Sequence, residues 1–438
     1  MSTPIGVSLI GCGAVGSHVA RMLLQQGDDL HQRTSCRFEL RHILVRDPKR
    51  RRDAAIPNNL FATDSAQLLN DTGTNVILEL AGGTDEARRL ILAALQAGKD
   101  VVTANKALLA LHGRDVFSAA RQVGRCVAFE ASVCGGVPLI ESIRRGLIGN
   151  QIDAVMGILN GTSNYILTRM LENNASYAHA LAEAQAAGYA EADPTLDVSG
   201  GDAAHKLAIL ASLAMRSACE FNRIQVEGIE KIELSDLTAG EQLGYRCKLL
   251  AVARRFDDGL DLSVQPTFIP TSHPLASVSG PFNAVSVYGT PIGHTFFYGR
   301  GAGGAATASA VIADLVDVAI GNARRTFESL VVLPDQTAPA VYRAPGETCC
   351  PHYIRVGLRD QPGGIGNLAT VLGSHGISIA TIVQHEPPQS ISTVAVPVIV
   401  TTHPSKEGCM RDAVADIAKM DATLTPPICI PVLEERMD

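Results

Sequence analysis

The chain has 438 residues, 46% of them hydrophobic, and its formal net charge is −7 at pH 7. This length and apolar content predict a globular protein with two or three cores, and the acidic balance argues against nucleic acid as a partner. No apolar stretch reaches the roughly 18 residues of a membrane span, and the first residues lack the pattern of a secretory signal, so we expect a cytoplasmic protein that binds small molecules and has no membrane partner.

A glycine-rich turn follows the first predicted strand. Residues 5–10 have the apolar pattern of a buried strand, Gly-Cys-Gly-Ala-Val-Gly follows at 11–16, and residues 17–26 have a helical pattern. In this order the glycines permit a tight turn and a close approach of the backbone to a pyrophosphate, which the positive end of the helix attracts. The pattern predicts dinucleotide binding, and a merely tight strand-to-helix turn is the alternative.

A basic cluster ends the second predicted strand, residues 38–45. Arg46 and Asp47 come first, and Lys-Arg-Arg-Arg follows at 49–52. An acidic residue at such a strand end binds a ribose diol, whereas arginines suit a 2′-phosphate. Asp47 keeps NAD possible, but the cluster favours NADP; the alternative is a solvated basic turn.

Strand and helix patterns then alternate. The strands are predicted at 76–80, 100–103 and 126–129, and the helices at 85–96 and 113–123. This alternation predicts an α/β unit with a Rossmann-type doubly wound sheet. The loops after two strand ends, at 81–84 and 104–106, fall where ligands bind in such sheets. Lys106 is therefore expected to contact cofactor or substrate, unless it is an ordinary surface lysine.

The predicted second domain starts at residue 136, and the pattern changes from about residue 152. A Gly-Pro bend at 130–138 leaves carbonyl groups that could bind a cation. Strand-like runs interrupted by helices follow and predict an α+β substrate and dimerisation domain, with the runs at 154–159, 248–254, 285–288 and 295–298. A glycine-rich turn at 299–304 precedes a helical segment at 307–320, which could return beside the nucleotide. The alternative is that the glycines form only a turn.

An acidic loop precedes an apolar helix in this domain. Glu191, Asp193, Asp197 and Asp202 fall within twelve residues, and Lys206 follows Asp202 by four. Residues four apart share one face of a helix. The pair is either an ordinary helix ion pair worth about 0.2–0.5 kcal/mol, or a polar substrate site in which burial lowers the pKa of the lysine and the carboxylate opposes that shift.

The last part of the chain has another character. Residues 331–350 are rich in proline with little periodicity, as in a linker. Residues 351–438 have the order βαββαβ of a ferredoxin-like sandwich, which we expect to serve regulation or oligomerisation. The predicted domains are therefore 1–135, 136–330 and 351–438, with the linker between the last two.

Three stretches together resemble the homoserine dehydrogenase family. They are the glycine-rich opening, Thr-Ala-Asn-Lys-Ala-Leu at 103–108, and Gly-Tyr-x-Glu-x-Asp-Pro at 188–194 with the acid and lysine that follow. Residues 351–438 resemble an ACT domain. The resemblance implies NAD(P)-dependent interconversion of L-homoserine and L-aspartate 4-semialdehyde in threonine and methionine biosynthesis. It also implies feedback by an amino acid, threonine first, through the ACT domain.

The resemblance implies roles for particular residues. Lys206 would be the acid and base, Glu191 and Asp202 would hold the substrate, and Lys106 would contact substrate and nicotinamide. The residues implied for the cofactor, NADP or NAD, are Gly11, Gly13, Ala14, Val15, Gly16, Arg46, Gly83, Thr84, Lys106, Gly188 and Gly303. The residues implied for a sodium ion are Glu130, Val133, Gly135 and Val137.

Two other classes of protein stay open. In a phosphorylating semialdehyde dehydrogenase a thiolate would attack the aldehyde, and Cys134 is the candidate nucleophile. In a redox sensor the chain would bind cofactor without turnover. Neither class explains the pair Asp202 and Lys206. The strand-rich second domain predicts a homo-oligomer, either a dimer through residues 140–300 or a tetramer.

Overall fold

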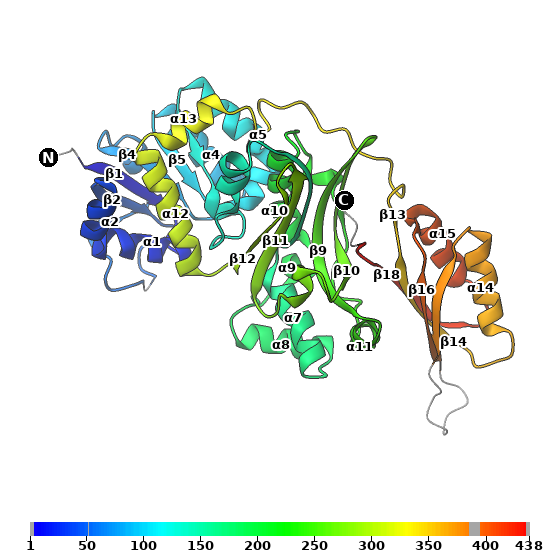
Figure 1. Ribbon diagram of the computed structural model, residues 1–438. Helices are drawn as coiled ribbons and strands as arrows, with labels where there is room; N and C mark the ends of the chain where they lie inside the picture. Colours follow the sequence, from blue (N-terminus) through cyan, green and yellow to red (C-terminus); the bar gives the residue numbers. More distant parts are fainter. Residues whose placement is uncertain (1–3, 51, 385–394, 435–438) are drawn as a thin grey trace.

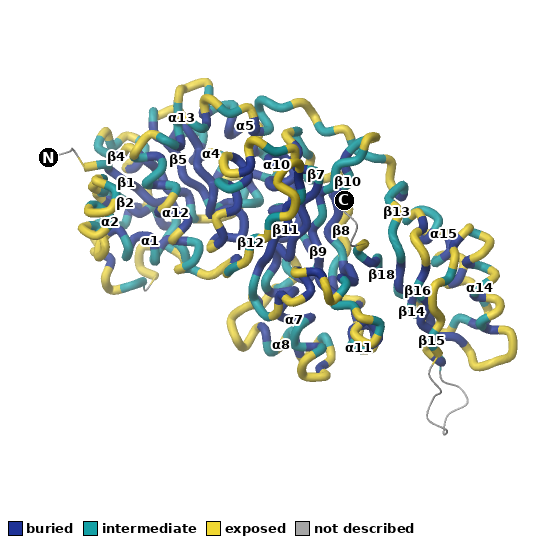
Figure 2. The backbone as a smooth tube through the Cα atoms, viewed as in Figure 1, coloured by how far each residue is buried: buried dark blue, intermediate teal, exposed yellow. Residues whose placement is uncertain are grey.

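The computed structural model describes residues 4–50, 52–384 and 395–434. Three sheets of four or more strands follow one another along the molecule (Figure 1). Their strands form the buried interior, while the outer helices and loops carry most of the exposed backbone (Figure 2). Arg51 of the predicted basic cluster lies outside the described residues, as do residues 385–394 and 435–438 of the predicted C-terminal unit.

The first sheet is parallel, with the strand order β3-β2-β1-β4-β5-β6. Its strands are β1 (Ile5–Ile10), β2 (Phe38–Leu44), β3 (Phe61–Ala62), β4 (Thr74–Glu79), β5 (Asp100–Thr103) and β6 (Val127–Ala128). Its helices are α1 (Ala14–Gln25), α2 (Gly27–Thr34), α3 (Ser65–Leu69), α4 (Asp85–Gln96) and α5 (Lys106–Gln122). The predicted Rossmann-type doubly wound sheet is confirmed.

Helix α5 begins earlier than predicted. The sequence pattern placed its start at residue 113, but the helix starts at Lys106. The cause is Asn105, whose side-chain oxygen accepts a hydrogen bond from the Leu108 N–H at 3.1 Å and so satisfies a free amide of the first turn. Lys106 is therefore the first residue of a helix and not part of a loop.

Two helices from later in the chain return to this sheet. They are α12 (Gly304–Ala319) and α13 (Asn322–Ser329), which lie beside α1 and β5 in Figure 1. Gly304 packs so closely that a Cβ there would lie 2.7 Å from the Ala14 carbonyl oxygen. Among the described residues no single helix is long and apolar enough to cross a membrane; α12 and α13 have that length and composition only together, and the chain bends by 80° between them.

The second sheet is mixed, in the order β12-β11-β7-β9-β10-β8. Its strands are β7 (Gln151–Ile158), β8 (Gln225–Val226), β9 (Tyr245–Phe256), β10 (Gly259–Pro270), β11 (Phe282–Thr290) and β12 (Gly293–Arg300). Its helices are α6 (Leu139–Glu141), α7 (Gly161–Glu172), α8 (Tyr177–Ala186), α9 (Thr195–Val198), α10 (Gly201–Ala214) and α11 (Leu234–Gln242). Short turns of 3₁₀ or π-helix complete the two units, namely η1 (Asn58–Leu60), η2 (Glu130–Ser132), η3 (Ser142–Gly146), η4 (Phe221–Arg223) and η5 (Pro274–Ser277).

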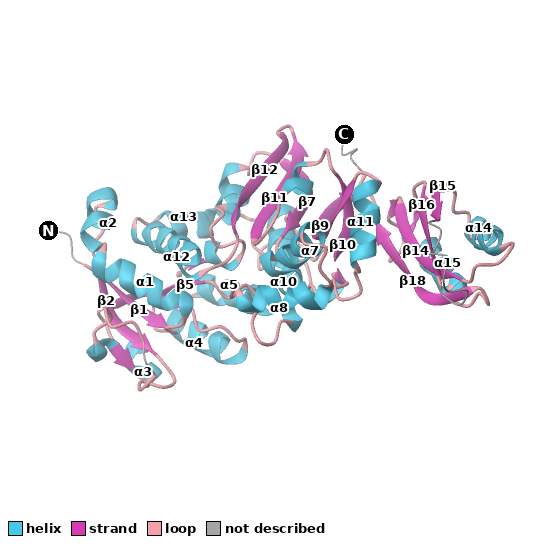
Figure 3. Ribbon diagram, turned by 90° about the horizontal axis from the view of Figure 1, so that it is seen from below, coloured by secondary structure: helices cyan, strands magenta, loops and turns pink. Residues whose placement is uncertain are grey.

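The third sheet is antiparallel, in the order β15-β16-β14-β18. Its elements are β14 (His352–Leu358), α14 (Gly364–Ser374), β15 (Ile379–Gln384), β16 (Val396–Thr402), α15 (Glu407–Ile417) and β18 (Thr423–Pro431), and a small ribbon joins β13 (Cys349–Cys350) to β17 (Ser405–Lys406). Both helices cover the face of the sheet that points away from the rest of the molecule (Figures 1 and 3). The predicted ferredoxin-like unit is confirmed.

A buried ion pair fixes the third sheet to the second. Asp236 on α11 is fully buried, and the Arg355 guanidinium on β14 donates to its carboxylate at 2.6 and 3.1 Å. The Tyr353 hydroxyl donates to the same carboxylate at 3.2 Å, and the ring of Tyr353 meets Phe268 of β10 edge-on at 4.9 Å. Since a buried carboxylate needs its partners, this contact holds the two sheets in one arrangement.

Replacing Arg355 by methionine is expected to lower the free energy of unfolding by about 3–5 kcal/mol, because the Asp236 charge stays buried without its cation. Urea unfolding followed by circular dichroism measures the change. Arg359→Met is the matched control, since Arg359 is exposed. Equal stability of the two variants would contradict the role given to the ion pair.

Candidate active site

The start of helix α10 places an acid and a lysine on one buried face. Gly200 precedes the helix with φ +87°, a conformation that favours glycine. Asp202 and Lys206 follow, with residue exposures of only 4% and 6%. The prediction that they share one helix face is confirmed, and their burial rules out the ordinary exposed helix pair.

Asp202 is the centre of a charged cluster. The Lys206 Nζ donates to Asp202 Oδ2 at 2.7 Å and to the Leu159 carbonyl oxygen at 2.6 Å. The Lys106 Nζ, from the first residue of α5, lies 2.9 Å from Asp202 Oδ1. Two ammonium groups from separate units thus share one carboxylate.

Asn160 completes this cluster and was missed as a site residue by the sequence analysis. Its Nδ2 donates to Asp202 Oδ2 at 2.8 Å and to Asp197 Oδ1 at 2.7 Å, while its Oδ1 accepts from the Ser163 N–H at 2.8 Å. The last bond caps α7. An asparagine before a helix is the available sequence signal, but it indicates a cap and not a site.

Opposing effects set the charges of the central pair. Burial alone would raise the pKa of Asp202, but Lys206 and Lys106 hold it well below its usual range. Burial alone would lower the pKa of Lys206, but Asp202 raises it above its usual value. The lowered lysine pKa considered from sequence is therefore not found in this state, and the carboxylate keeps the lysine an ammonium ion.

The three glycines of the dinucleotide turn have different surroundings. A Cβ on Gly11, where φ is +98°, would lie 2.7 Å from Ala81 Cα, and one on Gly16 would lie 2.4 Å from the Gly11 carbonyl oxygen. A Cβ on Gly13 would meet nothing within 4 Å. The outer glycines thus serve packing, and the middle one leaves open backbone at the start of α1, as pyrophosphate binding requires.

A cavity of about 550 Å³ adjoins this turn and is lined by Gly13, Arg46 and Asp47 among others. Arg46 is exposed, and Arg52 stacks on Phe61 at 5.1 Å. The Asp47 carboxylate accepts the Lys49 N–H at 2.8 Å. The carboxylate is therefore engaged within its own turn, while Arg46 lines the cavity and makes no ion pair with any residue that the structure describes.

Glu79 supports the loop that contains Gly83 and Thr84. It ends β4 with no exposure, and its carboxylate accepts from the N–H groups of Ala81 and Gly82 at 3.0 and 3.2 Å and from the Thr103 hydroxyl at 2.8 Å. Burial raises the pKa of Glu79, although these bonds oppose the shift. The sequence analysis missed this residue, because one acid at a strand end has no distinctive pattern.

Asn105 connects that loop to Lys106. Its Nδ2 donates to the Gly83 carbonyl oxygen at 2.7 Å, and its Oδ1 caps α5. Thr84 lies directly before α4. The predicted loop residues and the lysine are therefore held together at the carboxyl end of the parallel strands.

The remaining predicted glycines differ in their surroundings, and Glu191 does not join the charged cluster. Gly303, with φ +111°, directly precedes the Gly304 that packs on the dinucleotide turn. Gly188 has φ +74° and open space beside it. Glu191 is exposed, and its backbone carbonyl accepts from Gln185 at 3.1 Å; within the described residues its side chain makes no ion pair.

The turn proposed for sodium is tightly packed. The Glu130 carboxylate accepts the N–H groups of Ile140 and Glu141 at 2.9 and 2.7 Å, and the Val137 carbonyl accepts from Leu139 at 2.8 Å. No group of three or more His, Cys, Asp or Glu in the described parts of the chain is placed to hold a metal ion. Any ion here would depend on main-chain carbonyls, as Val133 and Gly135 could provide.

Cys134 does not suit the thiol mechanism. Its Sγ is buried and accepts from the Asn283 Nδ2 at 3.3 Å. Burial raises the pKa of this thiol, whereas a nucleophilic cysteine needs a lowered one. The arrangement therefore disfavours a semialdehyde dehydrogenase that works through Cys134.

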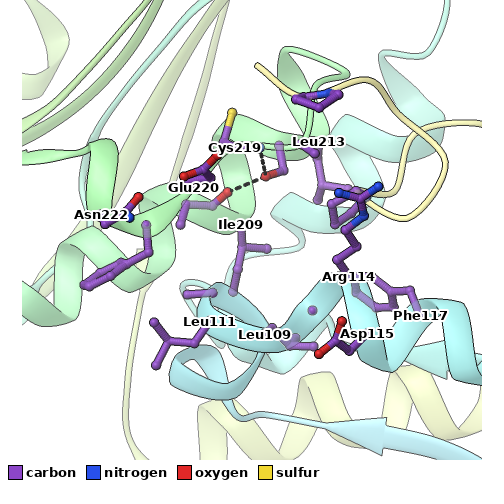
Figure 4. A pocket seen from close by; sticks show the side chains of 18 of the residues that line it. Leu109, Leu111, Arg114, Asp115, Phe117, Ile209, Leu213, Cys219, Glu220 and Asn222 are labelled. Atoms are coloured by element: carbon purple, nitrogen blue, oxygen red, sulfur yellow. Dashed lines mark hydrogen bonds between the residues drawn. The ribbon is translucent and has the colours of Figure 1, made fainter. Parts of the chain in front are cut away.

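A second cavity, of about 450 Å³, separates helices α5 and α10 beyond the cluster (Figure 4). Leu109 and Phe117 line it from α5, and Ile209 and Leu213 from α10. Lys106 and Asp202 lie in the first turns of α5 and α10, so their contact joins the starts of the two helices.

Comparisons with known proteins agree with this geometry. Residues 138–316 match the family model of homoserine dehydrogenase, residues 11–130 match that of the homoserine dehydrogenase NAD binding domain, and residues 352–407 match the ACT domain. The homoserine dehydrogenase of Pseudomonas aeruginosa is 41% identical over 434 residues, which cover 98% of this chain and 99% of that protein. The homoserine dehydrogenase of Bacillus subtilis is 37% identical over 402 residues, 92% of each chain.

Solved structures give the same result. The crystal structure of a homoserine dehydrogenase from Thiobacillus denitrificans has a TM-score of 0.91 at 37% identity and covers 99% of both chains. That of Staphylococcus aureus has a TM-score of 0.76 at 31% identity and covers 98% of this chain and 99% of that one. The chain therefore belongs to the homoserine dehydrogenase family of oxidoreductases, with an NAD-binding domain and a C-terminal ACT domain.

Proposed function

We propose that the chain interconverts L-homoserine and L-aspartate 4-semialdehyde, with Lys206 as the group that gives and takes the proton. The observation that carries this proposal is the buried pair of Lys206 and Asp202, which Lys106 joins from the carboxyl end of the parallel sheet that also holds the dinucleotide turn. A bound nicotinamide dinucleotide supplies or accepts the hydride at the carbon of the alcohol or aldehyde. The chain must therefore handle the proton at the oxygen.

The protonation state of Lys206 favours reduction of the aldehyde at neutral pH. Since Asp202 keeps Lys206 an ammonium ion, it can donate a proton to the oxygen of the aldehyde as the alcohol forms. In the oxidation, neutral Lys206 accepts the hydroxyl proton. The Leu159 carbonyl and Asp202 hold two of the ammonium hydrogens, which leaves the third for the substrate oxygen.

The substrate contacts belong to the proposal as well. Lys106 would contact the substrate and the nicotinamide, and Glu191 and Asp202 would bind the amino and hydroxyl end of the substrate. The exposure of Glu191 leaves its carboxylate free to accept an ammonium group. The glycines at 11, 13, 16, 188 and 303, with Ala14, Val15, Gly83 and Thr84, would approach the dinucleotide.

Turnover tests the proposal directly. Purified protein is mixed with L-homoserine and NADP⁺, or separately NAD⁺, and the absorbance of the reduced cofactor is followed. We expect reduction of at least one cofactor, and the same assay with L-threonine tests feedback. Nucleotide binding without any turnover would instead support the redox sensor.

NADP is the proposed cofactor, and Arg46 the proposed partner of its 2′-phosphate. Arg46→Ala is expected to raise the KM for NADP⁺ about 10- to 100-fold, because a hydrogen bond to a charged group contributes about 1.5–3 kcal/mol. The KM for NAD⁺ should change little. Arg33→Ala, at another exposed arginine, is the control, and an equal change for both cofactors would exclude the phosphate contact.

Four further points extend the proposal. A sodium ion would be held by carbonyls of the turn formed by Glu130, Val133, Gly135 and Val137. A homodimer or homotetramer would use the second sheet, whose edge strand β12 exposes Phe296 and Tyr298. Light scattering that finds a monomer would contradict this oligomeric state.

The protein would act in the cytoplasm. Its reaction would serve threonine and methionine biosynthesis, with threonine as effector.

A further inference from the structure

A buried asparagine lies behind the carbonyl group that holds Lys206. Asn283 is near the start of β11, and its exposure is only 1%. Its Nδ2 donates to the Leu159 carbonyl oxygen at 2.9 Å, and the same oxygen accepts from the Lys206 Nζ at 2.6 Å. Because a carbonyl oxygen has two lone pairs, these two donors use both of them. The orientation of this carbonyl group therefore depends on Asn283 as well as on Lys206.

The second amide hydrogen of Asn283 binds a strained residue. The Cys134 Sγ accepts it, at a distance of 3.3 Å from Nδ2. The backbone of Cys134 has φ +51°, a left-handed conformation that is strained for a residue with a side chain. Such strain persists only where the surrounding structure holds it, and it is common at functional sites. Cys134, which is unsuited to the thiol mechanism, is thus the acceptor that orients the amide.

The oxygen of this amide has a different environment from its nitrogen. Among the described residues no donor reaches the Asn283 Oδ1, although the atom is buried. A Cβ on Gly161 would lie 3.4 Å from this oxygen, and one on Gly301 would lie 2.4 Å from it. A buried polar atom without a hydrogen bond lowers stability and requires an explanation. The two bonds that Nδ2 donates are therefore the reason for an asparagine at this position.

The two glycines connect Asn283 to further segments of the site. Gly161 directly follows Asn160, whose side chain binds Asp202, and Gly301 lies in the glycine-rich turn before α12. In addition, β11 pairs with β7, the strand that leads to the carbonyl group. One buried amide thus contacts the acceptor of the lysine, the segment that holds the carboxylate, and the turn that returns to the dinucleotide.

We propose that Asn283 is a positioning residue, which fixes the Leu159 carbonyl group and so directs the ammonium group of Lys206 toward the substrate oxygen. Two of the three ammonium hydrogens bind Leu159 and Asp202, so the direction of the third depends on where these two acceptors lie. In this role Asn283 acts through Lys206 and touches neither substrate nor cofactor. The proposal rests on the proposed function, because it concerns the lysine that exchanges the proton.

Steady-state kinetics of Asn283→Ala measures the effect. The variant lacks both donated bonds and is expected to lower kcat for L-homoserine oxidation about 10- to 100-fold, because a displacement of about 1 Å at a catalytic group can cost about 100-fold in rate. The KM for NADP⁺ should change less than the kcat. Asn283→Asp has the same shape, but its carboxylate cannot donate, so kcat should fall as far. Wild-type kcat in either variant would overturn the proposal.

Asn164→Ala is the matched control. Asn164 is equally buried in the same unit, its Nδ2 donates to the Gly280 carbonyl oxygen at 2.9 Å, and its Oδ1 accepts from the Lys248 Nζ at 3.1 Å. These partners are not those of Lys206. The control should lower stability and leave kcat nearly unchanged, and a loss of kcat equal to that of Asn283→Ala would overturn the proposal.

A double-mutant cycle separates positioning from a merely structural role. If Asn283 acts through Lys206, its replacement has no ammonium group left to misdirect once Lys206 is alanine. Adding Asn283→Ala to Lys206→Ala should then change kcat by less than about twofold, since residues that act as a unit are not additive. A structural role would lower kcat by the same factor in both backgrounds, and that result would overturn the proposal.

Crystal structures of the wild type and of Asn283→Ala test the geometry apart from turnover. Catalytic groups must be held within about 0.5 Å of their productive positions, and we expect the Leu159 carbonyl oxygen and the Lys206 Nζ to move by more than this in the variant. Unchanged positions of both atoms would overturn the proposal even if kcat falls. If the wild type does not oxidise L-homoserine, the proposed function fails, and the crystal structures alone decide whether Asn283 positions the lysine.

Discussion

Replacing Lys206 by alanine is expected to lower kcat for L-homoserine oxidation about 10²- to 10⁴-fold, the usual contribution of general acid–base catalysis. The substitution removes the ammonium group that lies 2.7 Å from Asp202 and 2.6 Å from the Leu159 carbonyl, and no other lysine in the described part of the chain has both contacts. NADP⁺ binding, followed by fluorescence titration, should persist, because the dinucleotide turn belongs to a different unit. Steady-state rates in both directions measure the loss.

Lys99 provides the matched control for this prediction. It is also buried, and its Nζ also donates to carbonyl oxygens, those of Asp71 and Thr74 at 2.8 Å. These carbonyls lie at the start of β4, at the opposite edge of the sheet from the cofactor turn. Lys99→Ala should therefore lower stability and leave kcat nearly unchanged. Equal kcat in Lys206→Ala and wild type would refute the role of Lys206.

Local patterns predicted most of the first unit. Strand β1 (Ile5–Ile10), helix α4 (Asp85–Gln96) and strand β5 (Asp100–Thr103) have the predicted bounds, because each is a continuous apolar or amphipathic run between polar ends. Strand β10 (Gly259–Pro270) was missed. Its prolines and its long paired edge with β9 hide the pattern, since its place in the sheet depends on a partner strand and not on its own residues.

In the candidate site as well, local spacing predicted some features, and contacts between distant residues determined the others. The spacing of Asp202 and Lys206 predicted a shared helix face, since four residues make about one turn. It could not predict their burial or the approach of Lys106, because that contact joins residues far apart in the sequence through the packing of α5 against α10. Asn160 and Glu79 were missed because single polar residues at element ends gain their partners only in the folded chain.

Replacing Asp202 by asparagine is expected to move the pH dependence of the reaction toward acid. Without the carboxylate, burial dominates, so the pKa of Lys206, now raised by Asp202, falls. The neutral lysine needed for oxidation then exists at lower pH, and the ammonium form needed for reduction is lost at lower pH. Removing one partner of a buried ion pair costs about 3–5 kcal/mol, which at about 1.36 kcal/mol per unit allows a shift of about 2–4 pH units.

Profiles of kcat/KM against pH, for oxidation and for reduction, measure this shift. The sign of the shift is more informative than the rate at any single pH. A purely structural role for Asp202 would lower both limbs equally and leave the profile in place. Asp193→Asn is the control, because Asp193 lies in the same loop and its carboxylate accepts from the Thr195 N–H at 3.1 Å instead of from a lysine. A profile that stays fixed, or moves toward alkaline pH, would show that Asp202 does not set the charge of Lys206.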